Sequence, residues 1–99
     1  MAKLYVTEFL DAPRILGQVI QCGAQPGVDQ VPVVIGAGSL QSAAFAATTR
    51  FVRIHADSIC SVAFGINPTA TANSARMAAN ESDYFGVAPG QKVAVITNV

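Results

Sequence analysis

The chain has little charge and few of the residues that catalysis uses. Only 12% of its 99 residues are charged, six lysines and arginines balance six aspartates and glutamates, and there is one histidine and no tryptophan. An ordinary soluble domain carries about 25% charged residues. No basic run marks a nucleic-acid-binding surface, and no cluster of acids or activated nucleophile marks an active site. We therefore expect neither a nucleic-acid partner nor an enzyme.

Cysteine is also scarce, since Cys22 and Cys60 are the only two. Neither has a second cysteine or a histidine at the spacing of a metal site, so no metal is expected. The N-terminal segment carries Glu8 and Asp11 where a secretory signal needs an apolar core. We expect buried free thiols, as in a protein made in a reducing cytoplasm, with a disulfide as the alternative. No apolar run approaches the ~20 residues of a membrane span, so no membrane contact is expected.

Apolar residues, by contrast, are abundant at 52% of the chain. Ninety-nine residues make one domain, residues 1–99, and its single core is too small to hide that much apolar surface. Many of these residues are alanines, which tolerate exposure. The interpretation we favour is that copies of the chain or a larger assembly cover part of the surface, which predicts a homo-oligomer or a lattice.

Short alternating or apolar segments fill the chain, and none has the 3.6-residue period of a helix. They predict strands at residues 3–9, 15–22, 30–35, 76–79, 84–87 and 92–97. Residues 51–64 alternate on both sides of Asp57 and Ser58, which predicts a β-hairpin. Pro32 indicates an edge strand or a strand start. The predicted fold is all-β: a small β-sandwich, with the jelly roll as one candidate topology, of seven or eight short and mostly antiparallel strands.

One segment offers a different interpretation. Residues 39–49 are rich in alanine, which favours helix, but end in two threonines, which favour strand. They follow Gly36 and Gly38, and Asp57 lies about 20 residues further on, as in a Rossmann-like nucleotide site. The rest of the chain supplies no further βα units. A turn at Gly36–Gly38 is therefore our main interpretation, with no cofactor, and a small nucleotide-binding protein is the alternative.

His55 is the one candidate general base, and Asp57 is near enough in sequence to contact it. Neither Ser58 nor Ser61 sits in a nucleophile elbow, so a surface or interface histidine is expected. The aromatic residues expected in the core, with one or two of them as interface anchors, are Phe45, Phe51, Phe64, Tyr84 and Phe85.

The C-terminal half has a strand ending in Ala-Phe-Gly (63–65), a Pro/Thr/Ala-rich loop, a short segment at 76–79, an aromatic-Gly-Val strand (84–87) and a closing Val-Ala-Val-Ile strand (93–96). These features resemble small all-β virion proteins of tailed bacteriophages. The resemblance implies a non-enzymatic virion protein made in the host cytoplasm. It favours a capsid decoration or cement protein bound to the major capsid protein. A tail or fibre component that contacts the host surface is the alternative.

Three segments could meet a partner: the edge at 30–35, the loop at 65–75 and the N-terminal residues 1–9. From the first two we select as interface residues Pro32, Val34, Asn67, Pro68, Thr69 and Thr71.

Overall fold

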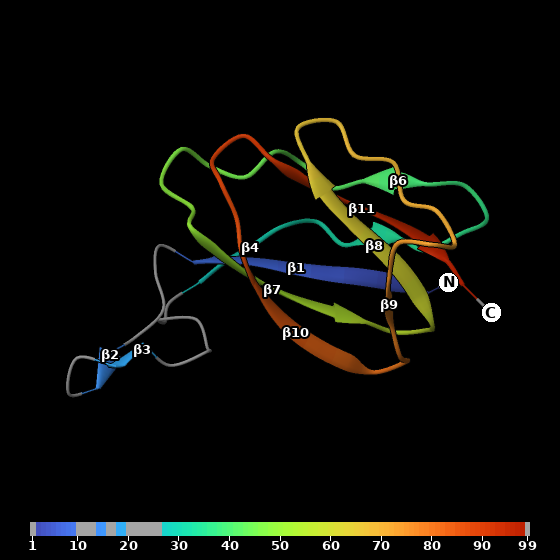
Figure 1. The fold of residues 1–99 in the computed structure, drawn as a ribbon, viewed down its shortest axis with the longest axis horizontal. Helices are drawn as coiled ribbons and strands as arrows, with labels where there is room; N and C mark the ends of the chain where they lie inside the picture. Colours follow the sequence, from blue (N-terminus) through green and yellow to red (C-terminus); the bar gives the residue numbers. More distant parts are fainter. Residues whose placement is uncertain (1, 10–13, 16–17, 20–26, 99) are drawn as a thin grey trace.

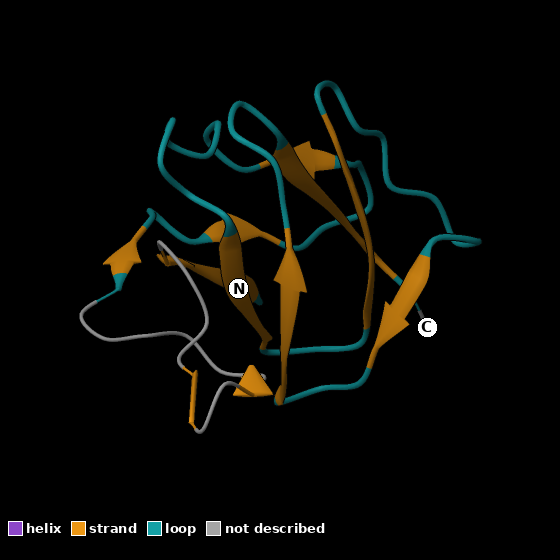
Figure 2. Cartoon of the chain, turned by 60° about the vertical axis from the view of Figure 1, so that its left-hand side comes forward, coloured by secondary structure: helices purple, strands orange, loops and turns teal. Residues whose placement is uncertain are grey.

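The computed structural model describes residues 2–9, 14–15, 18–19 and 27–98. They form two antiparallel sheets that face each other, together with a small separate hairpin (Figure 1). Strands, turns and irregular segments account for all the described residues, with no helix among them (Figure 2). Hence none of these segments is a long apolar helix of the kind that crosses a membrane. The predicted all-β sandwich is confirmed.

The first sheet has five strands: β1 (Lys3–Phe9), β4 (Val28–Asp29), β5 (Val33–Val34), β7 (Phe51–Ala56) and β10 (Glu81–Gly86). Their order is β10-β7-β1-β4, and β5 also pairs with β1. The second sheet has four strands: β6 (Leu40–Gln41), β8 (Cys60–Gly65), β9 (Ala75–Met77) and β11 (Lys92–Thr97). Their order is β6-β11-β8-β9.

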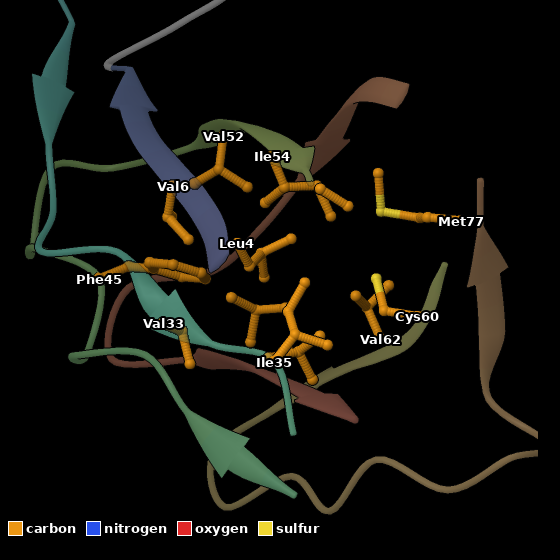
Figure 3. Close-up of a cluster of buried hydrophobic side chains, with 13 residues drawn as sticks. Leu4, Val6, Val33, Ile35, Phe45, Val52, Ile54, Cys60, Val62 and Met77 are labelled. Atoms are coloured by element: carbon orange, nitrogen blue, oxygen red, sulfur yellow. The ribbon is translucent and has the colours of Figure 1, made fainter. Parts of the chain in front are cut away.

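The core lies between the two sheets, because every second side chain of each long strand points inward. In β7 the inward residues Val52, Ile54 and Ala56 are fully buried, while their neighbours are partly exposed. Burying a valine, leucine or isoleucine contributes roughly 1.5–3 kcal/mol, so this cluster is the main source of stability. Figure 3 shows members of the cluster from both sheets, among them Leu4, Val6, Val52, Ile54, Cys60, Val62 and Met77.

The hairpin predicted for residues 51–64 is wrong. β7 pairs with β1 and β10, whereas β8 pairs with β11 and β9. Residues 57–59 therefore carry the chain from one sheet to the other (Figure 1). The inward-facing apolar side chains of the two strands explain this crossing. Val52 and Ile54 of β7 belong to the same buried cluster as Cys60 and Val62 of β8, which face them from the other sheet. In a hairpin these two sets of side chains would lie side by side on one face.

The strand predicted for residues 15–22 is also wrong. The chain reverses there, and β2 (Arg14–Ile15) pairs antiparallel with β3 (Gln18–Val19). Residues 20–22, the end of the predicted strand, lie outside the described part of the chain. This small hairpin pairs with neither sheet and lies beyond one end of the sandwich in Figure 1.

Residues 39–49 are neither a helix nor a long strand. They contain the two residues of β6 and then an irregular stretch with a turn at 47–48. No helix therefore follows Gly36 and Gly38, which lie in the connection between β5 and β6. A nucleotide site of the Rossmann type needs a helix N-terminus at that point. The structure provides none, and the turn interpretation is the correct one.

Pro32 interrupts one edge of the first sheet. β4 and β5 both pair with β1, and residues 30–32 stand opposite only two β1 residues. This bulge fits a proline, which has no N–H for the ladder. The extra residue leaves Val31 87% exposed and turns Val33 into the core. The edge position is confirmed, and the single strand expected at 30–35 is corrected to two separate two-residue strands.

The remaining strand predictions agree with the structure. Those at 3–9 and 92–97 match β1 and β11, and those at 76–79 and 84–87 overlap β9 and β10. In the turn before β11, Gly90 has a φ of 81°, a left-handed conformation that favours glycine.

Gly27 offers a test of the packing on the outer face of β1. An added Cβ there would meet Phe9 Cε1 and Thr7 Cγ2, each at 2.7 Å, whereas one at Gly36 would meet nothing within 4 Å. We expect Gly27→Ala to lower the free energy of unfolding by about 1–3 kcal/mol in urea denaturation, as in other overpacked sites. Gly36→Ala, the control, should stay within about 0.5 kcal/mol of wild type. Equal losses in both variants would contradict this packing.

Candidate functional site

A buried carboxylate holds one edge of the first sheet in place. Glu8, at the inner side of β1, is 8% exposed. Its Oε1 accepts hydrogen bonds from Thr49 Oγ1 at 2.5 Å and from the Ala46 N–H at 2.9 Å. Its Oε2 accepts one from Gln30 Nε2 at 2.9 Å. One side chain thus joins β1 to the irregular stretch at 42–49 and to the bulge between β4 and β5.

These bonds favour the charged form of Glu8. Burial by itself raises the pKa of a carboxyl group, but the hydrogen bonds from Thr49, Ala46 and Gln30 outweigh it, and the pKa of Glu8 lies below its ordinary value of 4.5. The carboxylate is ionised at neutral pH, where bonds to it are stronger than bonds between neutral groups. Gln30 Nε2 also donates to the carbonyl of Ala43 at 3.3 Å, which ties the bulge directly to the irregular stretch.

Between the bulge and β6 lies a hollow that we call the side groove, with a volume of about 420 Å³. Its lining residues, none of them charged, are Gln30, Val31, Pro32, Val33, Val34, Leu40, Gln41, Ser42 and Ala43. Val31 is 87% and Leu40 48% exposed, so large apolar side chains meet solvent here. Exposed apolar surface without charge is typical of the centre of a protein–protein interface.

A second hollow, the sheet groove, lies on the outer face of the first sheet. Its volume is about 520 Å³, and its lining residues are Tyr5, Val6, Thr7, Asp29, Gln30, Pro32, Arg53, His55 and Ser82. The strand register forms it, because Tyr5, His55 and Ser82 stand opposite one another on three adjacent strands. Gln30 and Pro32 line both grooves, so the bulge that Glu8 holds is the wall between them.

The sheet groove contains two sets of polar contacts. In the first, Thr7 Oγ1 donates to Asp29 Oδ1 at 2.7 Å and accepts from Arg53 Nη2 at 3.4 Å. One hydroxyl therefore stands between a carboxylate and a guanidinium. In the second, His55 Nδ1 lies 2.7 Å from Ser82 Oγ, and the ring of Tyr5 lies 6.3 Å from the His55 ring.

The contact considered between His55 and Asp57 is not formed. Asp57 is exposed, and within the described residues the hydrogen-bond partner of His55 is Ser82. A serine nucleophile needs a base that a third group orients. The described part of the chain places no such group on His55, so a complete triad is not assembled around this pair.

The outer face of the second sheet is covered. Ser61 and Ala94 point outward from their strands, yet both are fully buried. The loop after β8 lies over them: Asn98 Nδ2 donates to Ser61 Oγ at 2.7 Å and to the carbonyl of Ala72, within that loop, at 3.3 Å. On the corresponding face of the first sheet, none of the loops within the described ranges lies over the sheet groove in this way.

Of the selected interface residues, Pro32 and Val34 come together in the side groove, each partly buried. Sequence reasoning missed Val31 and Leu40, which are the more exposed apolar residues there. An apolar residue next to a proline at a strand edge was the available signal for Val31. Nothing in the sequence indicated that Leu40 would lie beside it.

The other selected residues lie in the loop between β8 and β9, on the second sheet. Gln41 Nε2 donates to Asn67 Oδ1 and to the carbonyl of Pro68, both at 2.8 Å, and Pro68 is buried. These two residues therefore anchor the loop to β6. Thr69 and Thr71 are exposed and remain available to a partner.

Cys60 is a buried free thiol, as expected. Burial raises the pKa of Cys60, and the nearby Glu81 carboxylate raises it further. Cys22 lies outside the described residues. Across the described ranges, no three histidine, cysteine, aspartate or glutamate side chains gather as metal ligands.

Comparison with known proteins gives no relative: no family model matches the chain, and no curated protein or solved structure is significantly similar to it. The features of the chain that bear on its function are therefore its composition and its two grooves. The first is apolar and uncharged, and the second is polar with an aromatic ring.

Glu8→Gln tests the carboxylate that joins the three segments. The amide cannot accept from all three donors, so we expect a loss of about 1–3 kcal/mol in the free energy of unfolding at pH 7. Because the folded-state pKa is lowered from the ordinary value of 4.5, the contribution of Glu8 is complete above that value and is lost as the pH falls through the folded value.

The difference between wild type and Glu8→Gln, measured by urea denaturation, should therefore shrink from pH 7 toward pH 3. Asp57→Asn, at an exposed position, serves as the control and should change stability by less than about 0.5 kcal/mol. A difference between wild type and Glu8→Gln that does not vary with pH would contradict the ionised state assigned to Glu8.

Proposed function

We propose that this protein is a non-enzymatic structural protein that docks onto other proteins in a large symmetric assembly, specifically a decoration or cement protein of a phage capsid. The observation that carries the proposal is the side groove, where Val31 and Leu40 are exposed among residues that carry no charge. Burying this surface against a partner removes apolar area from water and leaves no charge unpaired.

A lattice also explains how so small a contact could suffice. Nine residues line the side groove, whereas each partner in a standard stable interface contributes roughly 20–30 residues. Many copies on a symmetric shell add avidity, so each contact can be weak. The low charge of the whole chain, 12%, agrees with a protein that has neighbours on several sides.

The virion setting is supported by the resemblance of the C-terminal half to small phage structural proteins. That half contains β8 to β11 and the loop that covers the second sheet. The partner in this proposal is the major capsid protein, with further copies of the chain as neighbours. A position on the tail or fibre is the second candidate, because the side groove suits any protein partner with an apolar ridge.

The position of the protein on purified virions tests whether it belongs to the phage capsid. Cryo-electron microscopy or immunogold labelling of purified virions should place the protein on the head surface. Labelling confined to the tail would replace the first candidate with the second. Complete absence from virions would overturn both.

Leu40→Asp tests the docking surface. The variant places a charge in the side groove without removing a core residue, and we expect at least a tenfold loss of co-sedimentation with heads that lack the protein. Ile66→Asp is the matched control, since Ile66 is 67% exposed but does not line the groove. Equal impairment of the two folded variants, or wild-type binding by Leu40→Asp, would show that another surface docks.

A further inference from the structure

The polar side chains of the sheet groove lie outside the hydrophobic core, and several of them make few hydrogen bonds to other described residues. The Arg53 guanidinium has a single hydrogen bond in the described residues, the 3.4 Å contact with Thr7. Among the described residues, Asp29 has a side-chain hydrogen bond only at Oδ1, and none of them bonds the hydroxyl of Tyr5. Donors and acceptors with so few internal partners are suited to a polar ligand.

The charges of the sheet groove select against ions. It contains one guanidinium, Arg53, and one carboxylate, Asp29, with only the Thr7 hydroxyl between them. An anion drawn to Arg53 would be repelled by Asp29, and a cation drawn to Asp29 would be repelled by Arg53. A neutral ligand with hydroxyl groups meets both requirements, because each hydroxyl can donate to the carboxylate and accept from the guanidinium.

An aromatic ring beside these groups narrows the ligand class further. Tyr5 is 43% exposed, and its ring is tilted by 48° to the ring of His55. An exposed aromatic ring offers an apolar surface that also tolerates polar neighbours. A pyranose ring has matching features, since its C–H groups form an apolar face and its hydroxyls lie around the rim.

The groove is also built to hold such a ligand in one orientation. Tyr5, His55 and Ser82 lie side by side on β1, β7 and β10, whose backbones are about 4.8 Å apart. Sites on strands are more rigid than sites on loops. The volume of about 520 Å³ falls within the range of small-molecule sites and leaves room for a mono- or disaccharide.

We propose that the sheet groove binds a neutral saccharide. The sugar ring stacks on Tyr5, and its hydroxyls donate to Asp29 and accept from Arg53. Ser82, bonded to His55, supplies a further hydroxyl at the opposite end of the row. This site is separate from the side groove, so a virion protein docked through the side groove would keep the sheet groove open to glycans.

The test is a titration of the isotope-labelled full chain, followed in amide proton–nitrogen NMR spectra. The probes are the methyl glycosides of glucose, galactose, mannose and N-acetylglucosamine, together with lactose and cellobiose. At least one should give saturable shifts at the amides of Tyr5, Thr7, Arg53 and Ser82, with a dissociation constant on the order of 1 mM. Sodium acetate and inorganic phosphate should give no saturable shifts there.

Two variants of Tyr5 test whether its aromatic ring is what binds the sugar. Tyr5→Ala should weaken binding at least tenfold, whereas Tyr5→Phe, which keeps the ring, should stay within about threefold of wild type. Tyr84→Phe is the control, because Tyr84 lies on the same face but outside the groove. The proposal is overturned if no sugar gives saturable shifts, if acetate or phosphate binds there instead, or if Tyr5→Ala binds as wild type. None of these results bears on localisation in the virion, which tests the docking role by itself.

Discussion

The ionised carboxylate of Glu8 is the interaction on which both grooves depend. It accepts hydrogen bonds from Gln30 in the bulge and from Thr49 and Ala46 in the stretch after β6. That stretch also contributes Phe45, which is 3% exposed and closes one end of the core. The free-energy cost of burying the carboxylate is offset by the hydrogen bonds that it accepts. Because the donors belong to separate segments, the same bonds hold those segments to β1.

The outer faces of the two sheets differ in how much of each is covered by loops. The loop between β8 and β9 covers the second sheet, and two of its own residues, Pro68 and Ala70, are buried. The first sheet keeps a groove lined by alternate residues of three strands, and the bulge at its edge creates a second, apolar groove. An uncharged groove and a polar groove thus lie on either side of one wall. Under the two proposals, a chain of 99 residues would hold one contact in each.

Period-two alternation was enough to predict the class of fold, because alternation depends only on neighbours along the chain. It could not predict which strands pair: residues 51–64 read equally well as a hairpin and as a crossing between sheets. The three partners of Glu8 lie 22, 38 and 41 residues away, so no local pattern indicates them. Pro32 indicated the edge of the first sheet, and with it the side of the side groove that residues 30–34 form. The sheet groove depends on a register across three strands and could not be foreseen.

The most direct test of the central role of Glu8 is hydrogen exchange at the Ala46 amide. Ala46 is exposed, and its N–H is bonded to the Glu8 carboxylate. If that carboxylate fixes the stretch after β6, the Ala46 amide should exchange on the order of 100-fold more slowly than in an unstructured chain at neutral pH, and this protection should fall in acid as Glu8 is protonated. Exchange at the unprotected rate at neutral pH would contradict the claim that Glu8 holds the wall between the two grooves.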